Sequence, residues 1–349
     1  MGSARPERSV RRSRRRRAVR IRFLVSGGAG LGLGHVMRTA VLAAEARRQG
    51  HGVTLVVRGD ASARAALAAE LPGAPVESWR APDDAVHAGG AVVIDSPEEI
   101  GAELEMAQRR GVRTLVLDRT DHLGQADTTV LPVLHGPSIE HPRLYQGAAF
   151  VLIAPAVRAA DPAEYPGARS IALITAGGAD PLGLTAPLAE ALTAALAARG
   201  PIAPSLHVVV GPAFADGDAL ARRLARSSAY IHRALPRPAL AALMAQARFT
   251  LTGFGTTVYD LAALGTPVVY WTHRSKDLEA AKRLHARGVG ACGGDGTRLT
   301  VASITSVLEQ TVLQESWCAA ASARGRELVA PADGARAVLR LLEDGARPS

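Results

Sequence analysis

The chain has 349 residues, of which 48% are hydrophobic and only 4% aromatic, and its formal net charge is +9. This length suits two domains of ordinary size, each able to bury its own core. Abundant Ala, Gly, Val and Leu favour alternating strands and helices over a small all-β fold. No apolar run reaches the ~20 residues of a membrane span. The two cysteines, Cys292 and Cys318, lack metal-ligand or disulfide-framework spacing, so we expect a protein of the reducing cytoplasm.

The positive charge is concentrated at the amino terminus. Residues 1–20 contain nine arginines and one glutamate, so about +8 of the net charge lies there and the rest is nearly neutral. Because this segment has almost no apolar residues, we expect a disordered tail. It could hold polyanions weakly, or it could be an over-extended start of the reading frame. Since the remainder lacks a basic surplus, we expect no nucleic-acid partner.

The first predicted strand, over residues 23–25, leads into a glycine-rich loop. Residues 26–38 read SGGAGLGLGHVMR, and a helical pattern follows over 39–49. Glycines let a backbone approach a ligand closely, and the unpaired N–H groups of a helix start favour an anion. His35 and Arg38 are three residues apart and share one face of that helix start. The pattern therefore predicts acid/base chemistry on a phosphorylated substrate.

Two common glycine-loop motifs do not fit this stretch. A dinucleotide fingerprint needs G-x-G-x-x-G, and the position of its third glycine falls on Leu33 or His35. A P-loop needs Gly-Lys-Ser/Thr, and the only lysines of the chain are Lys276 and Lys282. The remaining alternative to a site is a tight strand-to-helix turn with a surface histidine.

Strands and helices alternate through the first half. We predict strands over 53–57, 91–95, 114–118 and 128–134, a short strand from Val76, and helices over 61–71 and 98–110. This order predicts a parallel sheet with right-handed crossovers, in which ligands gather beyond the carboxyl ends of the strands. Asp95 and Asp118 end two of these strands. They are expected at that edge, either as catalytic groups or as helix caps and solvated loop residues.

A second unit begins like the first. The stretch 135–169 is rich in Pro, Gly and Ala and weakly periodic, so we place the domain crossing in it. A strand over 171–174 then precedes a glycine loop and a helix over 185–199. Further strands are predicted over 207–211, 230–232, 249–252 and 267–271, and helices over 218–226, 238–247, 258–264, 277–288, 301–310 and 335–342. We expect domains at 21–157 and 168–330, followed by a carboxy-terminal helix and tail at 331–349.

A later glycine loop offers chemistry for a nucleotide. Gly255, Thr256 and Thr257 start a helix whose bare N–H groups and two hydroxyls suit a diphosphate. One turn further, the carboxylate of Asp260 could accept both hydroxyls of a ribose. The alternative is a plain turn followed by an exposed helical acid. Residues 270–272 end the next strand and are expected to border a bound sugar.

Taken in order, these motifs resemble the PseG/SpsG family. The resemblance rests on GLGHVMR from Gly32, GGADP from Gly177, GTT with Asp260, GTP from Gly265 and DGA from Asp333, and it covers about residues 21–345. The family is similar to the MurG glycosyltransferase. The resemblance implies an α/β protein of GT-B architecture, with two Rossmann-like domains whose parallel sheets face each other across a cleft.

The resemblance also implies an activity. Characterised family members hydrolyse a UDP-linked diacetamido-trideoxyhexose in pseudaminic acid synthesis and release free sugar and UDP. His35 would then be the general base for the attacking water, and Arg38 or the glycine loop would balance the departing charge. The nucleotide and its diphosphate would contact Gly34, Gly177, Gly178, Leu235, Gly255, Thr256, Thr257 and Asp260. Because helix starts can neutralise a diphosphate, neither a metal nor a separate cofactor is expected.

The sugar side departs from the family pattern. Family hydrolases carry Asp-His-Tyr after the third strand, whereas this chain has Asp95-Ser96-Pro97, and Asp118 is followed by Arg119 instead of a second Asp. Two alternatives therefore stay open. A glycosyltransferase would move the sugar from a UDP-sugar to an acceptor hydroxyl deprotonated by His35. A non-catalytic nucleotide-binding partner would dock through the arginine tail. The expected partner is a nucleotide-sugar, and the protein could be a monomer.

Overall fold

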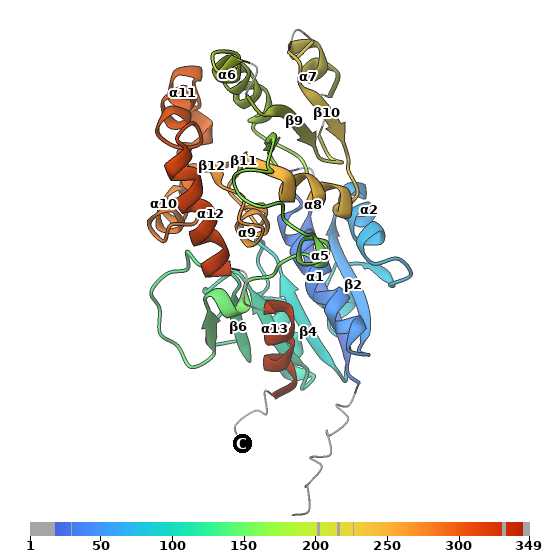
Figure 1. Cartoon of the computed structure of the whole chain (residues 1–349). Helices are drawn as coiled ribbons and strands as arrows, with labels where there is room; N and C mark the ends of the chain where they lie inside the picture. Colours follow the sequence, from blue (N-terminus) through green and yellow to red (C-terminus); the bar gives the residue numbers. More distant parts are fainter. Residues whose placement is uncertain are drawn as a thin grey trace, which may run out of the picture.

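The computed structural model describes residues 18–28, 30–200, 203–214, 217–225, 227–329 and 333–344. The chain forms two lobes, each built on a parallel sheet with helices packed against it (Figure 1). Of the predicted tail at 1–20, residues 1–17 lie outside the described residues. Its last residue, Arg20, already belongs to the first strand. The predicted α/β class with two parallel sheets is confirmed.

The first lobe, called the N-lobe, contains a seven-stranded sheet in the order β3-β2-β1-β4-β5-β6-β7, in which all paired strands run parallel. Its strands are β1 (Arg20–Gly27), β2 (Gly52–Gly59), β3 (Val76–Ser78), β4 (Ala91–Asp95), β5 (Arg113–Leu117), β6 (Thr128–Leu131) and β7 (Leu144–Gln146). Its helices are α1 (Gly34–Arg48), α2 (Ala61–Glu70), α3 (Pro82–Ala85) and α4 (Gly101–Arg109). The strands are almost continuously apolar because both faces of the sheet are buried. The neighbouring residues Phe23 and Leu24 show this, since both are 0% exposed and each belongs to a different core cluster.

The second lobe, called the C-lobe, contains a six-stranded parallel sheet in the order β10-β9-β8-β11-β12-β13. Its strands are β8 (Ile171–Thr175), β9 (Ser205–Val210), β10 (Tyr230–Arg233), β11 (Ala247–Gly253), β12 (Val268–Thr272) and β13 (Ala291–Asp295). The remaining helices are α5 (Pro155–Ala159), α6 (Thr185–Ala197), α7 (Gly217–Arg223), α8 (Arg237–Gln246), α9 (Thr257–Ala263), α10 (Leu278–Ala286), α11 (Val301–Gln310), α12 (Glu315–Val329) and α13 (Gly334–Asp344), with short 3-10 turns at Ala148–Phe150, Ser275–Asp277 and Gly296–Arg298.

The strand order of each sheet reverses direction at one point. This switch point lies between β1 and β4 in the N-lobe and between β8 and β11 in the C-lobe. Ligands of open α/β sheets bind outside the carboxyl ends of the strands at such a point. The loops after β1, β8 and β11 are the three glycine loops that the sequence singles out, and Asp95 ends β4. The topology therefore brings these three loops and Asp95 to the switch point of one sheet or the other, whereas Leu235 follows the edge strand β10.

Five of the described helices and strands differ from the sequence prediction, the first being the four-residue helix α3, which was not predicted. Within the predicted crossing, the chain forms β7 and the short helix α5. The strand β13 reads ACGGD, which has too few apolar or branched residues to indicate a strand, and the helix α12 was not predicted. The prediction that residues 270–272 border a sugar is wrong, since Tyr270, Trp271 and Thr272 are all 0% exposed.

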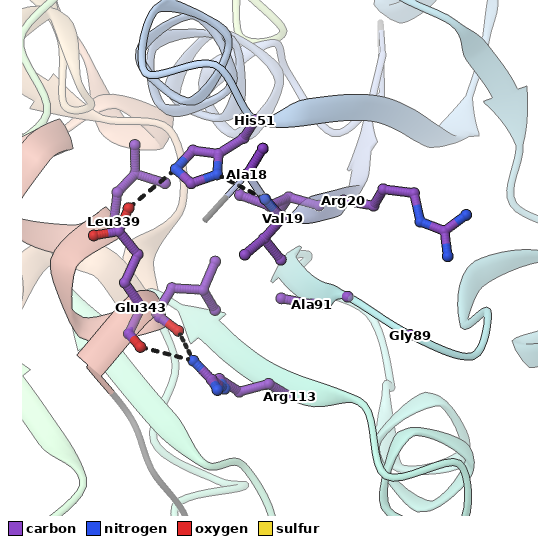
Figure 2. Close-up of a pocket in the computed structure, with 12 residues that line it drawn as sticks. Ala18, Val19, Arg20, His51, Gly89, Ala91, Arg113, Leu339 and Glu343 are labelled. Carbon is purple, nitrogen blue, oxygen red and sulfur yellow. Dashed lines mark hydrogen bonds and ion pairs between the residues drawn. The ribbon is translucent and has the colours of Figure 1, made fainter. Parts of the chain in front are cut away.

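The last helix, α13, leaves the C-lobe and packs against α1 of the N-lobe (Figure 1). Figure 2 shows how its end is held: Arg113 donates to the carbonyls of Leu342 and Glu343, and His51 lies between Val19 and Glu343. The last carbonyl groups of a helix have no N–H donor within the helix itself. The guanidinium of Arg113 supplies hydrogen bonds to these two. The hollow of about 350 Å³ beside them opens at the amino-terminal ends of β1, β4 and β5, opposite the switch point.

Candidate active site

The start of α1 leaves room for a ligand. No side chain of the described residues caps it. A Cβ atom placed on Gly34 would meet no protein atom within 4 Å, and its backbone is not in the left-handed region. Neither packing nor conformation therefore requires glycine here, and the open space lies beside the free N–H groups of the helix start.

His35, the second residue of α1, is held by the aspartate that ends β4. Its Nδ1 lies 2.6 Å from Oδ1 of Asp95, whose side chain is 1% exposed, whereas the His35 side chain is 23% exposed. The imidazole therefore has one edge fixed in the N-lobe and the other edge accessible. The predicted surface-histidine alternative does not describe this arrangement.

Arg38 joins the same aspartate to a second one. Its Nε and Nη2 donate to Asp95 at 2.9 and 2.7 Å, and its Nη1 donates to Asp118 at 2.7 Å. Burial works against ionisation of Asp95, but Arg38 and His35 outweigh it and hold its pKa below the ordinary range. Burial likewise opposes the charge on Arg38, but Asp118 and Asp95 raise its pKa above the ordinary value. We call these four residues, His35, Arg38, Asp95 and Asp118, the His35 cluster.

The charge states of the His35 cluster determine the tautomer of the imidazole. An ionised carboxylate can only accept a hydrogen bond, so the 2.6 Å contact requires the proton on Nδ1 of His35. In the neutral form of the imidazole, Nε2 then carries the lone pair. Arg38 Nη2, 3.0 Å from Nδ1, is satisfied by Asp95. The bare nitrogen on the accessible edge can accept a proton from a hydroxyl group.

Arg38 differs from its expected role. The sequence analysis expects Arg38 to balance the negative charge of the leaving group. In the structure the Arg38 side chain is only 5% exposed and forms ion pairs with two carboxylates. Arg38 therefore holds Asp95 and Asp118 in place through its buried hydrogen bonds. Asp118, at φ 62° and with its side chain 28% exposed, pairs with Arg38 instead of capping a helix.

The glycine loop of the C-lobe touches the start of α1. A Cβ atom on Gly178 would lie 2.7 Å from Cδ1 of Leu33, so only glycine allows this approach. Beside it, Gly177 has a φ of 88° and open space around it. Asp180 accepts hydrogen bonds from the amides of Leu184 and Thr185 at 2.8 and 2.9 Å and so caps α6. The glycine loops of the two lobes thus meet at one place, which we call the lobe junction.

The loop that starts α9 is open on its outer side. No side chain in the described ranges caps this helix at Thr256, and a Cβ atom on Gly255 would meet nothing within 4 Å. The amides of Gly255, Thr256 and Thr257 therefore form the kind of surface on which an anion can bind. Leu235, predicted to lie beside the base, follows Ala234 with φ 46° and packs its side chain against the core.

Asp260 is buried, which contradicts the alternative of an exposed helical acid. It is 6% exposed, its Oδ1 accepts from the Ala154 amide at 3.3 Å, and its Oδ2 lies 3.5 Å from Nη1 of Arg237. Burial raises its pKa, and Arg237 offsets this only in part. A ribose could bind this carboxylate only by taking the place of one of these long contacts.

Two residues that sequence reasoning missed lie at the lobe junction. His135 follows β6 and Tyr259 lies in α9, and Nδ1 of the histidine is 2.8 Å from the phenol oxygen. The imidazole ring packs 5.0 Å from the ring of Phe254, and Arg283 donates to its backbone carbonyl at 3.0 Å. Burial lowers the pKa of His135 to about 4. Its position within the predicted domain crossing was the only sequence signal.

The arrangement of two parallel sheets whose switch-point loops meet defines the GT-B architecture. No family model matches the sequence, and no curated protein matches it. The fold resembles MurG from Acinetobacter baumannii (14% identity, 93% of this chain and 99% of that one, TM-score 0.62) and the calicheamicin glycosyltransferase CalG4 (16%, 95% and 100%, 0.65). It also resembles a UDP-N-acetylglucosamine 2-epimerase (13%, 95% and 98%, 0.58). Identities this low show a common fold.

The described residues contain neither a membrane-spanning helix nor a cluster of metal ligands. None of their helices has both the length and the apolar composition that crossing a bilayer requires. Nor do three or more His, Cys, Asp or Glu side chains in these ranges gather in a way that could hold a metal ion.

Proposed function

We propose that this protein is a glycosyltransferase that moves a sugar from a nucleoside-diphosphate sugar to an acceptor hydroxyl. The observation that carries the proposal is the pair of His35 and Asp95, because the contact at Nδ1 leaves Nε2 on the accessible edge of the ring. Support also comes from the fold, because one structural neighbour is a glycosyltransferase and another is named for a UDP-sugar. UDP is the nucleotide expected from the resemblance to the PseG/SpsG family.

In the proposed reaction, His35 acts as a general base. The acceptor hydroxyl gives its proton to Nε2 while its oxygen forms a bond to the anomeric carbon. The bond from that carbon to the diphosphate oxygen breaks, and its electron pair leaves with UDP. Asp95 stabilises the resulting imidazolium, and Arg38 keeps Asp95 in place. Attack from the face opposite the nucleotide inverts the configuration at the anomeric carbon.

The nucleotide would bind to the C-lobe. Its diphosphate would lie on the amides of Gly255, Thr256 and Thr257 and of the Gly177-Gly178 loop. Its ribose would replace a contact of Asp260, and its base would lie along the main chain near Leu235. Helix-start amides supply the positive potential in this proposal, so no metal ion takes part in it.

Hydrolysis is the second candidate, and the ordered motifs that resemble PseG/SpsG favour it. Water would then take the place of the acceptor at His35, with the same proton transfer. The sugar-side departures at Ser96 and Arg119 weaken this reading for the particular sugar of that family.

One experiment separates the two candidates. The protein is incubated with a panel of UDP-sugars without acceptor, and free sugar and UDP are measured. Transfer predicts no turnover until a mixture of hydroxyl acceptors is added, whereas hydrolysis predicts release of both products from the start. A thermal-shift screen in which no nucleoside diphosphate raises the Tm would contradict both, because a ligand bound only to the native state stabilises it.

A further inference from the structure

A hydrogen-bond chain fixes the proton of His135. The backbone N–H of Leu134 donates to the phenol oxygen of Tyr259 at 3.0 Å, and that oxygen lies 2.8 Å from Nδ1 of His135. Tyr259 is 3% exposed, so its hydroxyl proton needs an acceptor within the protein. Nδ1 of His135 is the acceptor that the described residues provide. The proton of the imidazole therefore resides on Nε2.

The Nε2–H group of His135 is available to a ligand. Burial keeps the ring neutral above pH values of about 4, so the group is a donor without charge. The ring is only half-buried, and among the described residues no protein atom pairs with Nε2, which is also absent from the fully buried unpaired atoms. The lone pair of the imidazole is on Nδ1, which accepts the hydrogen bond from Tyr259. Nε2 can therefore only donate a hydrogen bond.

The position of the ring relates it to both halves of the lobe junction. It packs on Phe254, the residue before Gly255 of the proposed diphosphate loop. The charges of Asp118 and Arg38 from the His35 cluster act on its ionisation, as do those of Arg283 and Asp277 from the C-lobe. His135 thus lies near the proposed diphosphate loop and within reach of the charges of the His35 cluster, and it is tied to the C-lobe by Tyr259 and Arg283.

We propose that His135 binds the substrate by donating a hydrogen bond from Nε2 to the terminal phosphate of the nucleoside diphosphate. This inference rests on the function proposed above. The donor would engage the phosphate next to the sugar, so it would be engaged in the nucleotide-sugar and in the released diphosphate. A nucleoside monophosphate lacks this group and would not make the bond.

The test compares the affinities of UDP and UMP by titration calorimetry. In His135→Phe the ring can still pack on Phe254 but the donor is lost, and UDP affinity should fall about ten- to a hundredfold while UMP affinity stays the same. In His135→Gln the side-chain amide can accept from Tyr259 and donate outward. UDP affinity in that variant should stay within a few-fold of the parent.

Three results would overturn the inference. Equal UDP affinity in His135→Phe and the parent would show that His135 makes no hydrogen bond to the phosphate. If the KM for the nucleotide-sugar rose at the same time, the donor would be assigned to the sugar. Parallel loss of UDP and UMP affinity would show that His135 only supports the structure. If the parent protein binds no nucleoside diphosphate, the proposed function itself fails, and this is visible before any variant is made.

Discussion

The two lobes contribute to the junction in different ways. The N-lobe supplies charged side chains that are already paired: Arg38 holds two aspartates, and one of these holds His35. The C-lobe supplies Gly177 and Gly255, at which an added Cβ atom would meet nothing within 4 Å, and a start of α9 with no side-chain cap among the described residues. Paired charges fix the orientation of a reacting group, whereas open amides bind an anion that arrives and leaves. Under the proposed function, the N-lobe would carry out the chemistry and the C-lobe would bind the nucleotide.

The strongest test of this division replaces His35 by alanine. Loss of a general base lowers turnover by roughly 10²–10⁴-fold, and UDP affinity should be unchanged because the C-lobe amides remain. Steady-state kinetics and UDP titration measure the two effects. His87→Ala, at an exposed histidine of the same lobe, is the matched control and should match the parent. Parental turnover in His35→Ala would end the assignment.

A second test concerns the buried pairs of the N-lobe. Asp95→Asn leaves Arg38 with one carboxylate in place of two, and breaking a buried ion pair costs roughly 3–5 kcal/mol. We expect a loss of that size in the free energy of unfolding, measured by urea denaturation. Asp83→Asn, whose aspartate is 70% exposed beside Arg110, should cost less than about 1 kcal/mol. Similar losses in the two variants would mean that Asp95 is not a structural anchor.

A third test addresses pH and His135. Its pKa of about 4 lies below the ordinary 6.5, so the unfolded chain binds a proton between these values and the native protein does not. Stability should therefore fall as pH drops from 6.5 to 4, by about 2 kcal/mol from this group after allowance for partial exposure. In His135→Gln the slope of unfolding free energy against pH should be smaller. An unchanged slope would show that the ring ionises freely in the native protein.

A fourth test examines the C-lobe pocket at Asp260. If this carboxylate binds the ribose, the parent should prefer UDP over 2′-deoxy-UDP by about tenfold, and Asp260→Asn should remove that preference. The variant should unfold within about 1 kcal/mol of the parent, because burial already disfavours the charge and Arg237 keeps Glu70 as a partner. Retained preference would assign Asp260 to structure alone.

The smallest effect is expected from removing residues 1–17. Both lobes and the lobe junction are built from later residues, so the truncated protein should keep the turnover and UDP affinity of the parent. Activity and analytical ultracentrifugation of the two forms measure this. Loss of association with a partner on truncation would favour the non-catalytic reading of the chain.

Local patterns predicted what is local. The loops at His35 and Gly255 were predicted because strand, glycines and helix start follow each other within a few residues. The pairing of His35 with Asp95 spans 60 residues and that of His135 with Tyr259 spans 124, so only the fold brings these groups together. The burial of Asp260 depends likewise on Ala154 and Arg237, and β13 is a strand because β12 offers it a partner.

The return of α13 to the N-lobe has a consequence for how the chain can be rearranged. One imidazole, that of His51, contacts both Val19 and Glu343, so the two ends of the folded body are neighbours. A short linker could join them, and new termini could be opened at the exposed turn of Pro72 and Gly73. In such a circular permutant both lobes would keep their sheets, whereas a cut between the lobes would deprive the N-lobe of the helix that covers it.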